Sequence, residues 1–187
     1  MIYLILLILI VLGWGYVVSV YNSIIKSKNS VQEAKGSIET VLQNRLDLIP
    51  NLVDVVKEYT DHEKSTLTEV TKMRSELMSA DWVSKERMQK ENQLTWTLKS
   101  LFALSENYPD LKANENFLNL QEQWKQIEQK LQQARQTYNL TVKSFWDEIQ
   151  TFPNQIIANQ MNLPEYEMYE AEQQANQAPD AKDLFNS

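Results

Sequence analysis

The chain has 187 residues, of which 23% are charged, and its formal net charge is -7. A nucleic-acid-binding surface needs clustered Lys and Arg, and no such basic stripe appears, so we expect no nucleic-acid partner. Three glycines and five prolines are too few for a protein built of many short strands. The composition therefore predicts an all-α protein.

Residues 1–21 contain no charged side chain and consist mainly of Ile, Leu and Val. As a helix, this segment would span roughly the 30 Å of hydrocarbon in a bilayer. A cleaved signal peptide is the alternative. However, no Lys or Arg precedes the segment, it exceeds a typical signal core of about 7 to 15 residues, and Val17-Val18-Ser19 is a mediocre cleavage site. We therefore predict an uncleaved transmembrane anchor in residues 1–21.

The charges that flank the anchor predict its orientation. Lys26, Lys28 and Lys35 all follow the anchor, whereas only the terminal amine precedes it. Because Lys and Arg close to a span tend to stay on the cytoplasmic side, we expect the N-terminus outside and the body in the cytoplasm. The prediction is thus a single-pass protein of the cell (inner) membrane.

Residues 22–160 are predicted to form a helical bundle domain. Apolar or small residues recur at three-four spacing from Ile24 to Leu42, which indicates that the anchor helix continues beyond the membrane. Pro50 marks either the start of a new helix or a kink. We favour a turn at Pro50 and keep a kinked continuous helix as the alternative.

Two further helices are predicted between Pro50 and Pro109. Apolar residues from Leu52 to Leu77 keep helical spacing, and a second pattern runs from Met88 to Ser105. In the latter, Trp96 is expected to widen the apolar face. Pro109 closes that segment.

The most regular pattern predicts a fourth, long helix with a coiled-coil-like seam. Its apolar positions are Phe117, Leu120, Trp124, Ile127, Leu131, Ala134, Tyr138, Thr141, Phe145, Ile149 and Phe152. Such a seam needs partner helices along much of its length. Because long helices joined by short connections pack antiparallel, we predict an antiparallel up-down bundle, with four helices as the favoured number.

Residues 161–187 form an acidic segment rich in Gln and Asn, with isolated aromatic residues such as Tyr166, Tyr169 and Phe185. No helical stripe persists there. We favour a mostly extended or flexible tail, and the alternative is a strap whose aromatic side chains dock on the bundle.

The residues that could carry chemistry are few. His62 is the only histidine, whereas carboxylate-bridged di-iron bundles need two Glu-x-x-His motifs and zincins need His-Glu-x-x-His. Cysteine is absent, and no nucleophile-elbow sequence accompanies a serine. We therefore predict no catalytic, cofactor-binding or metal-binding residue and no enzymatic activity. The alternative is an enzyme or a metal- or metabolite-binding bundle of unknown chemistry.

Polar residues stand close to the apolar seams at Arg45, Arg74, Arg135 and Asn139. Buried polar groups need partners, so a fixed pair of Arg45 with Asp47 or Asp54 could set the helix register. We favour the other interpretation, in which each arginine lays its stem along the bundle edge and keeps its head in water.

Several motifs resemble the bacterial LemA family over nearly the whole chain. They are residues 45–53 (RLDLIPNLV), residues 108–117 (YPDLKANENF), Ala134-Arg135, Tyr138-Asn139 and Phe152-Pro153. The resemblance implies a single N-terminal transmembrane helix, an up-down helical bundle and no established enzymatic activity.

Together these features predict a membrane-anchored, non-enzymatic interaction or scaffolding module at the cell envelope. Its expected partners are the lipid bilayer, through residues 1–21, and envelope or cytoplasmic proteins of unknown identity. Self-association through the Trp14 face of the anchor, or through a seam left open on the long helix, is a further hypothesis within the same structural class.

Overall fold

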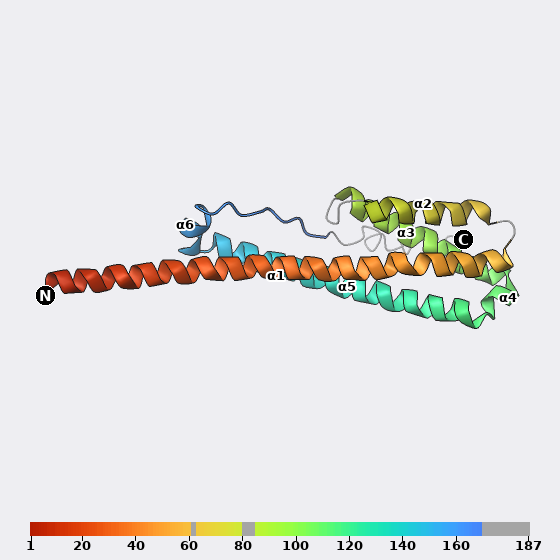
Figure 1. The fold of residues 1–187 in the computed structure, drawn as a ribbon, viewed down its shortest axis with the longest axis horizontal. Coiled ribbons are helices and arrows are strands. Elements are labelled where there is room, and N and C mark those ends of the chain that lie inside the picture. Colours follow the sequence, from red (N-terminus) through yellow and green to blue (C-terminus); the bar gives the residue numbers. More distant parts are fainter. Residues whose placement is uncertain (61–62, 80–84, 170–187) are drawn as a thin grey trace, which may run out of the picture. The chain divides into compact units, whose positions relative to one another are not determined.

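A computed structural model of the protein describes residues 1–60, 63–79 and 85–169. In these ranges every regular element is a helix, which confirms the all-α prediction (Figure 1). The helices are α1 (Ile2–Tyr59), α2 (Lys64–Ser79), α3 (Lys85–Leu104), the 3-10 helix η1 (Ser105–Asn107), α4 (Pro109–Lys112), α5 (Glu115–Gln150) and α6 (Asn154–Ala158). The chain divides into two compact units, Lys35–Ala134 and a unit that joins Met1–Ala34 to the segment from Arg135 onward.

Helix α1 passes through Pro50 without a break, so the favoured turn at this residue is wrong and the continuous helix is right. Proline has no N–H, which leaves the carbonyl of Leu46, four residues earlier, without its helical donor. Arg74 Nε of α2 donates a hydrogen bond to this Leu46 oxygen at 2.9 Å. The Arg74 side chain thus supplies the donor that Pro50 lacks, and the Pro50 ring lies on an exposed face of α1.

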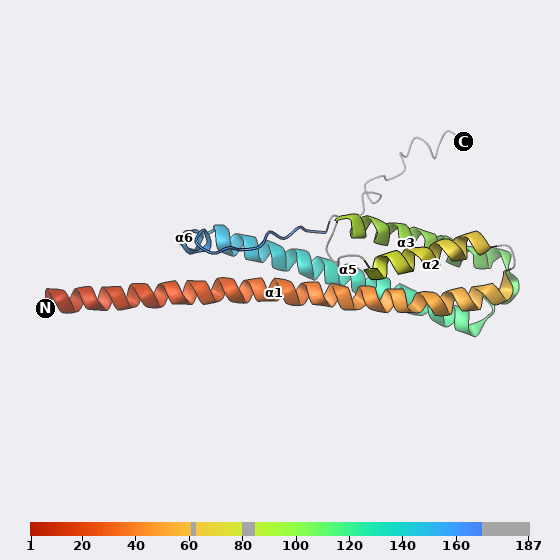
Figure 2. The same cartoon turned by 45° about the horizontal axis from the view of Figure 1, so that its top comes forward.

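In the unit of residues 35–134, four helices run up and down around one core (Figure 2). The predicted apolar stripes meet there, because each helix turns its three-four face inward. The buried side chains include Leu46, Ile49, Val53 and Val56 of α1, Leu67, Val70 and Leu77 of α2, Leu94, Leu98 and Leu101 of α3, and Phe117, Leu120 and Trp124 of α5. Leu111 of α4 joins the same core.

Two aromatic residues lie outside the apolar faces to which the sequence assigned them. Trp96 is 48% exposed, because two residues correspond to about 200° of helix rotation and turn it away from buried Leu94 and Leu98. Phe152 is 76% exposed, because α5 ends at Gln150 and the predicted seam stops with it. Both side chains are therefore available on the surface.

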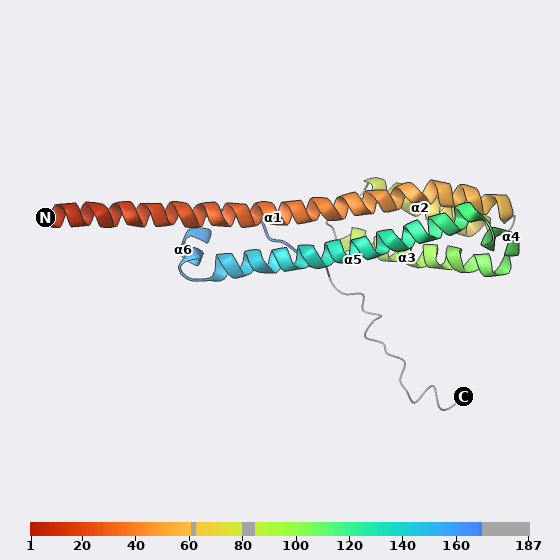
Figure 3. The same cartoon turned by 90° about the horizontal axis from the view of Figure 1, so that it is seen from below.

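The second unit pairs the first part of α1 with the last part of α5 (Figure 3). Val20, Ile24, Val31 and Ala34 are buried on α1, as are Tyr138, Val142 and Phe145 on α5. By contrast, residues 1–19 are exposed throughout. This end of α1 has a window of mean hydropathy 2.5, of which none is buried, so it is long and apolar enough to cross a membrane.

The hydrogen bond between Arg74 and the Leu46 carbonyl should contribute more to the free energy of unfolding with proline at position 50 than with alanine there. We expect Arg74→Met to lower the free energy of unfolding by about 1–3 kcal/mol, because it leaves a carbonyl without its charged donor. In the Pro50→Ala background the cost should be smaller, because the new backbone N–H can bond to Leu46. Urea unfolding of the full chain in detergent micelles, followed by circular dichroism, measures both costs.

Lys72→Met is the matched control, since Lys72 is an exposed cation of α2 that pairs with Glu76 one turn away. Equal costs of Arg74→Met in the two backgrounds would show that Arg74 does not compensate for Pro50.

Candidate functional site

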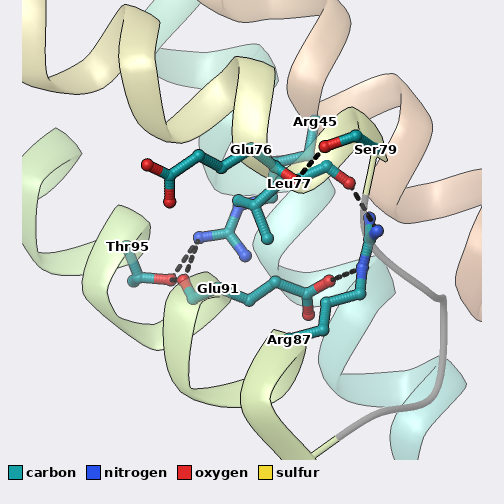
Figure 4. Close-up of polar contacts among 7 residues, drawn as sticks. All are labelled: Arg45, Glu76, Leu77, Ser79, Arg87, Glu91 and Thr95. Atoms are coloured by element: carbon teal, nitrogen blue, oxygen red, sulfur yellow. Dashed lines mark hydrogen bonds and ion pairs between the residues drawn. The ribbon is translucent and has the colours of Figure 1, made fainter.

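Arg45 of α1 places its guanidinium inside the bundle of residues 35–134, with only 1% of the residue exposed. Its Nη2 donates to the Glu91 carbonyl oxygen at 3.3 Å and to Thr95 Oγ1, both on α3 (Figure 4). Its Nε lies 3.2 Å from Glu128 Oε1 of α5. Its guanidinium carbon lies 4.7 Å from the ring centroid of Trp124, also on α5. Arg45 therefore joins three helices.

A second buried arginine extends the network to α2. Arg87 of α3 is 2% exposed, and its Nε lies 2.8 Å from Oε1 of Glu91, which is equally buried. Its Nη1 donates to the Leu77 carbonyl oxygen at 2.5 Å (Figure 4). Because Leu77 lies in the last turn of α2, where carbonyls have no helical donor, Arg87 caps this helix. We call Arg45, Arg87, Glu91, Thr95 and Glu128, whose side chain is 30% exposed, the buried polar network.

The charges of this network balance, with two arginines facing two glutamates. Burying an ion costs several kcal/mol unless a partner of opposite charge and hydrogen bonds compensate. Here the contacts of the guanidinium groups come from carboxylates, a hydroxyl and backbone oxygens of the bundle itself. The arrangement thus has the chemistry of a framework that fixes helix positions.

Neither Asp47 nor Asp54, the two alternative partners that the sequence offered for Arg45, is its partner in the structure. Asp47 is exposed and accepts a hydrogen bond from Gln43 Nε2 at 2.9 Å, and Asp54 is also exposed. Two residues along a helix place side chains on nearly opposite sides, so Asp47 cannot face Arg45. The favoured placement of the Arg45 head in water is also wrong.

Arg87 and Glu91 were missed as network members. The signal was present in the spacing, because both continue the buried stripe of Leu94, Leu98 and Leu101 at four- and three-residue intervals. Charges of opposite sign one turn apart on an apolar face indicate a buried pair. His62 lies outside the described residues, and among those described no three His, Asp or Glu side chains group to hold a metal ion.

A shallow hollow on the outside of α2 and α3 gathers further charges. It is lined by Glu69, Lys72, Met73, Glu76, Lys90 and Gln93. Lys90 Nζ lies 3.3 Å from Glu76 Oε2 and 3.4 Å from Glu86 Oε1. Hydrogen bonds to Glu76 and then Glu86 raise the pKa of Lys90.

In the other unit, Asn139 of α5 binds the backbone of Tyr169. Its Nδ2 donates to the Tyr169 carbonyl oxygen at 2.8 Å, and the Tyr169 N–H donates to Asn139 Oδ1 at 2.9 Å. The Tyr169 ring packs edge-on against Tyr138 at 5.5 Å between centroids, and the Arg135 guanidinium carbon lies 5.2 Å from it. Residues up to Tyr169 thus form the strap that the sequence left as the alternative, and residues 170–187 lie outside the described part.

Aromatic burial continues along the strap at Tyr166, whose ring packs edge-on against Phe145 at 5.4 Å. Burial, followed by the proximity of Tyr166 and Glu167, raises the pKa of Tyr138, and burial raises the pKa of Tyr166. Both phenols hence stay neutral at physiological pH. Their contribution to stability is complete below pH of about 10 and is lost as the pH rises above that value.

The protein belongs to the class of all-α helical bundles in which an apolar N-terminal helix continues into the bundle. Its bundle is of the up-down type and contains a buried polar network. The model of the LemA family matches residues 34–182, and the chain belongs to this family. The chain is similar to Protein LemA of Metamycoplasma hominis, with 25% identity over 144 residues, which is 77% of this chain. The alignment covers 66% of that relative, just under two thirds of its length.

Removing one charge of the Arg87–Glu91 pair should destabilise the bundle more than removing both. We expect Glu91→Leu to lower the free energy of unfolding by about 3–5 kcal/mol, because it leaves Arg87 buried without its carboxylate. The double variant Arg87→Met/Glu91→Leu should lose less, since no charge of this pair remains. Urea unfolding of the full chain in detergent micelles measures both variants.

The matched control is Glu122→Leu, an exposed position on α5 that should change stability by less than about 0.5 kcal/mol. A double variant that loses the sum of the two single losses would contradict a coupled pair.

Asn139 should hold the strap at Tyr169. In Asn139→Ala, hydrogen exchange of the Tyr169 amide should accelerate on the order of tenfold, because the carboxamide acceptor is lost. Hydrogen-exchange mass spectrometry of peptides that contain Tyr169 measures the rate. Gln136→Ala, at an exposed position of the same helix, should leave it unchanged. Equal rates in both variants would show that the carboxamide does not hold the strap.

Proposed function

We propose that this protein is a membrane-anchored, non-enzymatic module that binds envelope or cytoplasmic proteins through the outer surface of its four-helix bundle. The continuity of α1 carries the proposal. One helix holds both the apolar residues 1–21 and the core residues from Leu46 to Val56, so no linker separates the two in sequence. Whatever the bundle binds is thereby recruited to the membrane.

Residues 1–21 serve as the anchor, with the N-terminus outside and the bundle in the cytoplasm. Lys26 and Lys28 follow the apolar segment directly, and cations at this position favour the cytoplasmic side. The bundle is then available to cytoplasmic proteins and to the cytoplasmic parts of other envelope proteins.

The buried polar network supports a structural module over an enzyme. A general acid or base must come within hydrogen-bond distance of a substrate. The carboxylate of Glu91 instead pairs with Arg87 inside the bundle, at 3% side-chain exposure. Charges used in this way fix the geometry of a surface presented to a partner.

Trp96 on α3 is the proposed point of contact with a protein partner. Its side chain is 48% exposed, and Lys99 Nζ lies 4.9 Å from its ring centroid. Tryptophan is enriched among the residues that dominate protein–protein binding energy. A cation stacked on the ring keeps it soluble until a partner covers it.

Site-directed crosslinking next to Trp96 tests the proposal. Because the chain has no cysteine, Ser100→Cys, one turn from Trp96 and exposed, can carry a single photoreactive maleimide. In native membranes we expect discrete crosslinked products whose yield falls severalfold when Trp96→Ala is added. Gln129→Cys, exposed on α5, is the matched control and should not give the same products.

Products that persist unchanged with Trp96→Ala, or no products at all, would argue against this contact surface. The same Ser100→Cys variant tests the orientation. A membrane-impermeant maleimide should label it only after the membrane is opened, and labelling of intact cells would place the bundle outside.

A further inference from the structure

We propose that the turn between α5 and α6 is a second membrane contact, which lies at the boundary between headgroups and acyl chains beside the anchor. Residues 149–164 contain no charged side chain, although 23% of the chain is charged. Only the N-terminal stretch of residues 1–25 is a longer charge-free run. Charges are expensive in the hydrocarbon region, so their absence from a segment removes the main obstacle to lipid contact.

The structure brings these two charge-free stretches together in one unit. Ser23 Oγ donates to Glu148 Oε1 at 2.5 Å, which sets these residues at the same level of the antiparallel helices α1 and α5 (Figure 3). Gln150 ends α5 about 3 Å beyond Glu148, at the 1.5 Å rise of a helix. The turn that follows therefore reaches the level of Val20, close to the end of the apolar residues 1–21.

The change from exposed to buried residues along α1 occurs at the same position along the helix axis as the α5–α6 turn. Residues 1–19 are all exposed, and Val20 is the first buried residue, at 7% exposure. Protein therefore covers one face of α1 from Val20 onward, and among the described residues that follow Arg135 the α5–α6 turn lies nearest the exposed apolar segment (Figure 3). If lipid surrounds residues 1–19, the turn lies at its surface.

The turn presents large apolar side chains outward at this level. Phe152 is 76% exposed and Ile156 is 60% exposed, whereas Ala158 of the same short helix is 7% exposed. Helix α6 thus has an inner side that packs and an outer side that does not. Lipid suits the outer side, since it removes apolar surface from water, and the Asn and Gln residues between can bond to headgroups.

Lipid is the occupant that the observations favour over a protein, because the exposed turn is continuous with the apolar segment of α1. Lys26 and Lys28 follow on α1, as expected for residues at headgroup level. This inference rests on the proposed membrane anchor. The experiment below separates failure of the turn from failure of the anchor.

Depth-dependent fluorescence quenching tests the contact in the full chain. Single cysteines at Ile156→Cys, Leu12→Cys and Leu140→Cys carry an environment-sensitive NBD label, and the protein is reconstituted in phosphatidylcholine vesicles with doxyl-labelled lipid. Leu140 is the matched control, because it is 61% exposed on α5 in the same unit but eight residues before Glu148, about 12 Å farther from the lipid. Leu12 reports the anchor.

We expect shallow doxyl groups to quench the Ile156→Cys label at least threefold more than the Leu140→Cys label. The Leu12→Cys label should be quenched most by deep doxyl groups. Adding Phe152→Asp should lower the quenching at position 156 at least twofold, because a carboxylate draws the turn toward water, whereas Gln136→Asp, exposed on α5, should not.

Quenching at position 12 with none above the control at position 156 would overturn the second contact and leave the anchor intact. Quenching at position 156 alone would support the contact and overturn the anchor, and quenching at neither would overturn both. A label at position 156 that is shielded from aqueous iodide but not quenched by lipid would show that protein covers the turn, which also overturns the inference.

Discussion

The burial of the Arg45 guanidinium is the constraint on which the four-helix bundle depends. A cation at this depth is tolerable only where partners compensate for its lost hydration. Those partners are Thr95 and the Glu91 carbonyl on α3 and Glu128 with Trp124 on α5. An apolar seam alone would tolerate sliding by a helical turn, but such a slide would separate Arg45 from both sets of partners. The network therefore disfavours a shift of one helical turn between α1 and its neighbours.

Three arginine-to-carbonyl hydrogen bonds form a closed cycle that connects α1, α3 and α2. Each of three arginines reaches from its own helix to a backbone oxygen of another. The bonds run from Arg45 of α1 to Glu91 of α3, from Arg87 of α3 to Leu77 of α2, and from Arg74 of α2 to Leu46 of α1. Two of these oxygens lack a helical donor, one because of Pro50 and the other because α2 ends. Each bond therefore stabilises both a helix and its position.

Local spacing was enough to predict α3, α5 and most of the core, because an apolar stripe depends only on neighbours three and four residues away. It wrongly placed Leu52 and Leu77 on one helix, since α1 ends at Tyr59 and α2 begins at Lys64. It could not predict continuity at Pro50, since Arg74, which supplies the compensating donor, lies 28 positions from its acceptor Leu46. It also favoured the head of Arg45 in water and offered only Asp47 or Asp54 as alternative partners, although the true partners lie on other helices. The strap was undecidable for the same reason, because Asn139 meets Tyr169 across 30 positions.

Charge distribution connects the anchor to the rest of its unit. Exposed apolar surface is a liability in water, yet it occurs both in residues 1–19 and at the α5–α6 turn. The proposed lipid contacts would account for both exposures with one lipid surface. A lone spanning helix can rotate about its axis and tilt, whereas a second contact away from that axis, at Phe152 and Ile156, restricts both motions for the unit of residues 1–34 and 135–169. The turn would thereby fix the orientation of this unit relative to the membrane, which the spanning helix alone would leave free.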